Sequence, residues 1–134
     1  MNVLIVDSNP ERQSQLESLL LGLQFHPRKL HGAASISDAS HLLSSRKFGC
    51  CFFALDWGAA DGFMLLSEFS SSPLVGRLPL ISYAVDATKE NVVALIQAGA
   101  TGFLVSPFTV NEVRSVLKFV PKAEVPAERA KEPK

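Results

Sequence analysis

The stretch CCFFALDWGAADG, residues 50–62, places a carboxylate directly after a run of six apolar residues. Such a run is typical of a strand that is covered on both faces, as in a parallel sheet. Asp56 stands at the end of this strand, before a turn of small residues that closes with Asp61 and Gly62. A buried strand has no obvious use for an acid at its tip, so Asp56 either carries a function or simply ends the strand.

Strand and helix patterns alternate on both sides of this stretch. We expect further strands at 2–6, 26–30, 78–84 and 102–105, and helices that begin near residues 9, 36, 62, 88 and 110. Several helix ends carry capping or stop signals, namely Ser8 or Asn9 before Pro10, Ser35 with Asp38, Thr109 with Glu112, and Gly99. Five strands that alternate with five helices predict an α/β domain with a parallel sheet and helices on both faces.

The composition excludes several classes of protein. The 13 basic and 13 acidic residues cancel to a net charge of zero, so nothing indicates a surface that binds nucleic acid or anionic membranes. No apolar run reaches the roughly 18 residues of a membrane span, and no signal peptide precedes the first strand pattern. We predict a cytoplasmic protein with one domain at 1–120 and a flexible tail or interdomain linker at 121–134, where Pro, Ala and charged residues lack periodicity.

The residues at the strand ends carry the strongest functional signal. In parallel α/β sheets, ligands bind at the carboxyl ends of the strands, where the strand order reverses. Two of these ends carry carboxylates, Asp7 and Asp56. Such a pair suits a magnesium ion, which takes one or two carboxylates, several waters and often a phosphate.

Three segments together resemble bacterial response-regulator receiver domains of the chemotaxis-regulator type. They are LIVDSNP (4–10), LDWGAADG (55–62) and PLISYAVDATKENVVALIQAGATGFLVSPFT (79–109), and the resemblance covers residues 1 to about 120. The part KENVVALIQAGATGFLVSPF is highly specific. The resemblance implies a flavodoxin-like (βα)5 three-layer sandwich with a five-stranded parallel sheet in the order 2-1-3-4-5.

The resemblance also implies roles for individual residues. In that family, an aspartate at the end of the third strand accepts a phosphoryl group from a histidine kinase, and two acids after the first strand help to hold Mg²⁺. The loop after the phosphoacceptor supplies a further metal ligand from its backbone. Asp56 matches the phosphoacceptor and Asp7 matches the first acid, so both are candidate metal ligands.

Three positions depart from the family pattern. Ser8 stands where the second acid is expected, Ala84 where a hydroxyl residue ends the fourth strand, and Ser106 where a lysine ends the fifth. A phosphate adds roughly −1.5 to −2 charges, and without the lysine we expect no fixed cation to meet them. The loop from Asp56 to Asp61 is also about two residues shorter than is usual in the family. We therefore expect weak magnesium binding at most.

Each of these residues also has a plainer interpretation. Asp56 is either a residual phosphoacceptor or an acid that caps nearby backbone amides. Asp7 either binds metal weakly or orders the following turn, and two unbalanced carboxylates close together could share a proton in the absence of a metal. Phe103 matches the family's switch aromatic residue; we hypothesise that it stays inward because Ala84 obstructs it little, and the alternative is an ordinary core phenylalanine. The Ser106–Pro107 bond matches a position that is commonly cis.

We predict a degenerate receiver that acts as a signalling or protein–protein interaction module, is not an enzyme and lacks conventional aspartate phosphorylation. Its partner would be another protein or a fused output domain, bound through the face of the fourth helix, fifth strand and fifth helix; a histidine kinase is a further candidate. The alternative is a functional or atypical phosphoacceptor, modified on Asp56. A flavodoxin-like cofactor binder is a weaker hypothesis, because SNPERQ is a helix cap rather than a glycine-rich phosphate loop.

Overall fold

The computed structural model describes residues 1–85 and 89–118. In these residues, five parallel strands form one sheet in the order β2-β1-β3-β6-β7. Because β6 and β7 are the fourth and fifth strands of this sheet, the predicted order 2-1-3-4-5 is confirmed. The strands are β1 (Val3–Val6), β2 (Leu30–Ala33), β3 (Cys50–Ala54), β6 (Leu80–Ala84) and β7 (Gly102–Val105).

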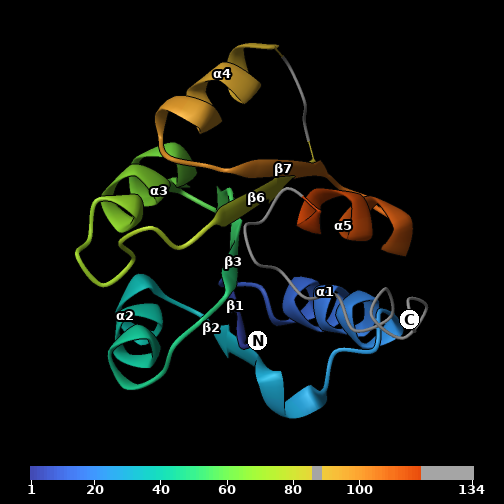
Figure 1. Cartoon of the computed structure of the whole chain (residues 1–134). Coiled ribbons are helices and arrows are strands. Elements are labelled where there is room, and N and C mark those ends of the chain that lie inside the picture. The colour runs from blue at the N-terminus through green and yellow to red at the C-terminus, as the bar shows by residue number, and fades with distance from the viewer. Residues whose placement is uncertain (86–88, 119–134) are drawn as a thin grey trace.

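Helices cover both faces of the sheet and complete the three layers (Figure 1). The two helices α1 (Pro10–Gly22) and α5 (Val110–Leu117) pack on one face. The other face carries α2 (Ile36–Ser45), α3 (Gly62–Ser70) and α4 (Lys89–Gln97). None of the helices in residues 1–85 and 89–118 is long and apolar enough to cross a membrane.

Local sequence signals account for most helix boundaries. The side chain of Asn9 accepts a hydrogen bond from the Arg12 amide, and Pro10 occupies the first position of α1, where its missing N–H costs nothing. Thr109 and Glu112 form the predicted capping box at the start of α5. Gly99, beyond the end of α4, has a φ of 108°, which glycine adopts without strain.

The predicted strand at 26–30 is wrong. Pro27–Lys29 form a short 3-10 helix, η1, which His26 caps, and β2 begins only at Leu30. Pro27 has no amide hydrogen and a fixed φ, so it starts a helical turn more readily than it extends a sheet ladder. The strand expected at 78–84 likewise begins at Leu80. The predicted tail, 121–134, lies outside the described residues.

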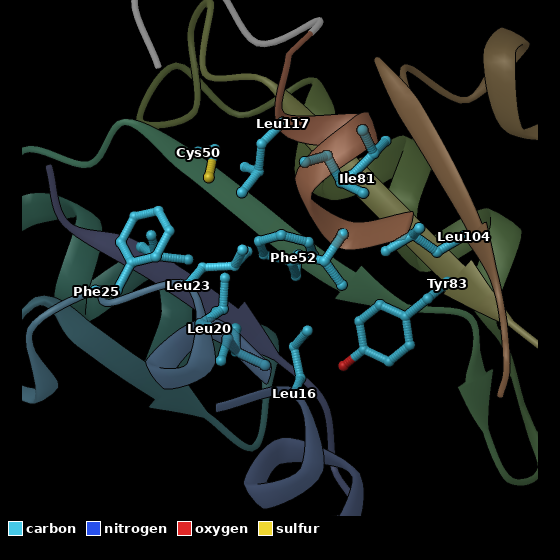
Figure 2. Packing of buried hydrophobic residues seen from close by; sticks show 14 of the residues in the cluster. Leu16, Leu20, Leu23, Phe25, Cys50, Phe52, Ile81, Tyr83, Leu104 and Leu117 are labelled. Carbon is cyan, nitrogen blue, oxygen red and sulfur yellow. The ribbon is translucent and has the colours of Figure 1, made fainter. Parts of the chain in front are cut away.

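The core between the sheet and helices α1 and α5 surrounds the central strand. Figure 2 shows Phe52 of β3 between leucines of α1 and Leu117 of α5, with Ile81 and Tyr83 of β6 alongside. Every residue of β1 and β3 is buried, which is the pattern expected for strands covered on both faces. The sheet is therefore a rigid platform for the residues that follow its carboxyl ends.

The two cysteines lie in β3, one toward each face of the sheet. Cys50 belongs to the core on the α1 and α5 side, and Cys51 to the core on the opposite side. Both are free thiols and both are buried. Burial raises the pKa of Cys50 to about 12, because a thiolate would lose its hydration there.

Candidate functional site

Asp7 follows β1 and is completely buried. Its Oδ1 accepts hydrogen bonds from the Asn9 amide (2.9 Å) and from Nη2 of Arg12 (2.7 Å). Its Oδ2 accepts from Nε of Arg12 (2.9 Å) and from the hydroxyl of Tyr83 (2.8 Å). A carboxylate offers about four acceptor positions, so the acceptor capacity of Asp7 is filled from within the protein.

Asp56 follows β3 and lies much closer to solvent, with 62% of its side chain exposed. It begins a small antiparallel hairpin of β4 (Asp56–Trp57) and β5 (Ala60–Asp61) that the sequence did not predict. Its Oδ1 accepts from the Gly58 amide (3.1 Å), and Gly58 has the positive φ of 67° that a tight turn requires. The carboxylate thus holds the turn and also remains accessible.

Gly62 explains how the short loop rejoins the fold. A β-carbon at Gly62 would collide with the backbone carbonyl of Leu55. The side chain of Asp61 caps α3 by accepting hydrogen bonds from the amides of Phe63 and Met64. The Asp61–Gly62 pair therefore serves local architecture, and it brings the start of α3 against the end of β3.

Arg12 of α1 lies between the two acids, and sequence reasoning missed it. Besides its two hydrogen bonds to Asp7, its Nη1 donates to Oδ2 of Asp56 (3.2 Å) and its Nη2 donates to the Asp56 carbonyl (2.9 Å). The expectation that the pocket has no fixed cation is wrong, and so is the expectation of two unbalanced carboxylates. The hydrogen bond to Asp7 raises the pKa of Arg12 further, so the guanidinium remains charged.

Tyr83 is the second residue that the sequence did not reveal. It lies in β6, and Figure 2 shows its ring in the core with the hydroxyl at the edge of the cluster. Burial, and then the adjacent charge of Asp7, raise the pKa of the phenol well above its ordinary value. The hydroxyl therefore remains protonated and acts as a donor to Asp7.

Replacing Tyr83 by phenylalanine is expected to lower the free energy of unfolding by about 1.5–3 kcal/mol, because a hydrogen bond to a buried charged group is lost. Urea denaturation measures the difference. Ser70→Ala is a suitable comparison, because it removes a neutral hydroxyl hydrogen bond to the Ala98 carbonyl, worth about 0.5–1.5 kcal/mol. Equal losses in the two variants would contradict a charge-assisted bond at Tyr83.

The three positions that depart from the family pattern carry small neutral side chains and add no charge to the group formed by Arg12 and the two acids. Ser8 is exposed, and Ala84 is half-buried at the end of β6. Ser106 is half-buried and precedes Pro107 through a cis peptide bond. Together with Arg12 and Tyr83, Ser106 and Pro107 line a cavity of about 420 Å³ between α1 and the loop after β7.

Phe103 lies in β7, away from the acids. Its side chain is half-buried and packs against the core on the α2, α3 and α4 side. It lines a cavity of about 160 Å³ toward α4 and another of about 340 Å³ toward α5. Its role as a switch residue stays a prediction.

The residues present do not fit a magnesium ion. In residues 1–85 and 89–118, no group of three or more His, Cys, Asp or Glu side chains is placed to hold a metal. Asp7 has no acceptor position left, and Ser8 replaces the expected second acid. A magnesium ion, which demands near-octahedral oxygen ligands, would find only one of the two predicted acids, Asp56, accessible.

The five-stranded parallel sheet, with acids directly after β1 and β3, defines a flavodoxin-like α/β domain. The chain belongs to the family described as the response regulator receiver domain, which matches residues 3–118. It is similar to the chemotaxis protein CheY-3 of Vibrio cholerae, with 27% identity over 120 residues that cover 87% of this chain and 88% of CheY-3.

Solved structures share the fold. CheY4 of Vibrio cholerae superposes with a TM-score of 0.76 at 19% identity, covering 89% of this chain and 97% of the other. A receiver domain of a sensor histidine kinase from Pseudomonas aeruginosa, with a magnesium ion coordinated in its active-site cleft, has a TM-score of 0.72 at 21% identity and covers 89% and 96%. At these identities, the similarity establishes the fold alone.

Proposed function

We propose that this receiver domain is a signalling module that works by binding another protein or a fused output domain, without the usual cycle of aspartate phosphorylation. The observation that carries this proposal is the state of Asp7: a fully buried carboxylate whose acceptor positions are filled by Arg12, Tyr83 and the Asn9 amide. The acid that should help to hold the metal is thus used to hold the fold.

The other positions support the same conclusion on chemical grounds. Phosphoryl transfer needs little covalent chemistry from a protein, and its catalysis comes almost entirely from positioning and from stabilising charge. Ser8, Ala84 and Ser106 are small and neutral where an acid, a hydroxyl and a lysine would take part. The guanidinium of Arg12 is engaged with both Asp7 and Asp56. Asp56 is accessible to solvent, but the acid, hydroxyl and lysine that would assist phosphoryl transfer in the family are absent at the matching positions.

The partner surface that we propose is the face formed by α4, β7 and α5. Three apolar side chains on this face are exposed by 36–65%, namely Val93, Ile96 and Val105. Phe103 is half-buried and lines one cavity with Ile96 and another with Val105. Apolar side chains gathered on one face are typical of protein interaction sites.

Exposure of the domain to beryllofluoride, a phosphoryl analogue, tests the proposal. Labelled with ¹⁵N and mixed with magnesium and beryllofluoride, the domain is expected to keep its amide spectrum around Asp56, because no site holds both metal and anion. Acetyl phosphate is likewise expected to leave the intact mass unchanged. Asp56→Asn, which keeps the size of the side chain, is the matched control.

A mass gain of one phosphoryl group that is present in the natural protein and absent in Asp56→Asn would overturn the proposal. It would establish the second candidate function, an atypical phosphoacceptor. Two observations favour that candidate: the carboxylate of Asp56 is 62% exposed, and the Arg12 guanidinium lies 3.2 Å from it. A histidine kinase would then be the phosphoryl donor.

A further inference from the structure

We infer that Arg12 is a built-in cation that replaces the divalent metal ion in this receiver site and makes the site independent of magnesium. The inference rests on the proposed function and deepens it, because it identifies what stabilises the acids in place of a metal. It concerns residues that approach one another only in the folded chain: Arg12 from α1, Asp7 after β1 and Asp56 after β3.

The groups that Arg12 contacts are the first argument. Its guanidinium donates to the carboxylate of Asp7, the carboxylate of Asp56 and the backbone carbonyl of Asp56. A metal in a receiver site draws on the same kinds of group: an acid after the first strand, the acceptor aspartate, and a carbonyl from the loop that follows it. The planar guanidinium, with five donors in a fixed geometry, can bridge several oxygens at once.

The second argument is that Arg12 and a metal exclude each other. Arg12 contributes to both of the ion pairs that the described side chains form. With the capacity of Asp7 filled, a magnesium ion, whose ligands approach to about 2.0–2.1 Å, could bind that carboxylate only by displacing one of its hydrogen-bond donors, Arg12, Tyr83 or the Asn9 amide. A metal that bridges both acids would also have to displace the guanidinium that already bridges them.

The position of Arg12 on its helix is the third argument. It is the third residue of α1, in the first turn, where the helix dipole disfavours a cation. The two acids offset this local disadvantage. Asp7 is fully buried and cannot lose its counter-ion cheaply, so the arginine is explained by the acids rather than by the helix.

The test compares Arg12→Gln with the natural domain and with Arg28→Gln, an exposed arginine outside the site. Thermal unfolding is followed with about 10 mM MgCl₂ or with NaCl of equal ionic strength. Arg12→Gln is expected to lower the Tm by roughly 10–20 °C, because it leaves a buried charge unpaired. Magnesium should then raise the Tm of Arg12→Gln by roughly 5 °C, because it binds the two acids that the arginine no longer contacts. In the natural domain and in Arg28→Gln, we expect magnesium to leave the Tm unchanged.

Two results would overturn the inference: equal stabilisation of all three proteins by magnesium, or no response of Arg12→Gln to it. A second measurement needs no variant, in case Arg12→Gln does not fold. Mn²⁺ at up to about 1 mM is added to the ¹⁵N-labelled natural domain, and we expect no selective broadening of the amides of Asp7, Asp56 and Gly58. Selective broadening there would show a working metal site and exclude the built-in cation.

The two proposals fail in different ways. If acetyl phosphate modifies Asp56 in metal-free buffer, the proposed function is wrong, while Arg12 still stands in place of the metal. If Mn²⁺ binds at the acids but neither acetyl phosphate nor beryllofluoride acts on Asp56, the inference about Arg12 is wrong and the proposed function stands.

Discussion

Replacing Phe52 by alanine is expected to lower the free energy of unfolding by about 3–5 kcal/mol, because it leaves a cavity in a tightly packed core. Phe52 is fully buried in the central strand β3, and its backbone lies between those of Ile5 and Ile81. Figure 2 shows that side chains from both α1 and α5 surround its ring. Denaturation in urea measures the loss directly.

Phe48→Ala is the matched control, since it removes the same ring from a half-buried position. Phe48 packs at the margin of the opposite core and makes an edge-to-face contact with His31. Phe48→Ala is expected to lower the free energy of unfolding by about 1–2 kcal/mol, because less apolar surface is removed from a buried environment. Equal losses of unfolding free energy in the two variants would contradict the central place of Phe52 in the core.

Alkaline pH above about 9 is expected to destabilise the domain through its buried thiol Cys50. The ordinary pKa of a cysteine thiol is 9.0, and burial raises that of Cys50 to about 12. Between these values the unfolded chain releases a proton that the folded domain keeps, so stability is complete below about pH 9 and falls as the pH rises. One such group lowers the free energy of unfolding by about 1.4 kcal/mol per pH unit, which amounts to about 2 kcal/mol at pH 10.5.

The buried groups Cys51 and Tyr83, whose pKa values are also raised, act in the same direction. Urea denaturation between about pH 8 and pH 10.5 measures the slope of stability against pH. Cys50→Ala removes one titrating group, and the slope should fall by about 1.4 kcal/mol per pH unit. An unchanged slope in this variant would mean that Cys50 is ionised in the folded domain.

The arrangement of the site suggests how a receiver domain can lose its metal and keep its fold. A buried acid after the first strand requires a counter-ion, whatever the function of the site. An arginine in the first turn of α1 supplies a permanent one, whereas a metal depends on its concentration. If the site holds neither a metal nor a phosphoryl group, as we propose, it no longer needs the second acid, the hydroxyl and the lysine of the family pattern.

Local patterns were enough to predict the alternating strands and helices, the helix caps and the acids at the strand ends, whereas the order of strands in the sheet was implied by the resemblance to receiver domains. These features depend on residues close together in the chain: six apolar residues before Asp56, Asn9 before Pro10, Thr109 with Glu112. Where local signals compete, prediction was less accurate. Pro27 turned an expected strand into a 3-10 helix, and the hairpin at 56–61 was too short to show a strand pattern.

The sequence by itself determined the family, the parallel sheet and the place of Asp7 and Asp56 at its carboxyl edge, because periodicity and motif order encode them. Only the tertiary structure decided what surrounds these acids. Arg12 and Asp56 are 44 positions apart in the chain, and Tyr83 and Asp7 are 76 apart. Such pairs leave no local pattern, and they form because parallel strands bring distant chain segments to one edge. That is why the guanidinium that pairs with both acids, and the phenol that donates to Asp7, became visible only in the fold.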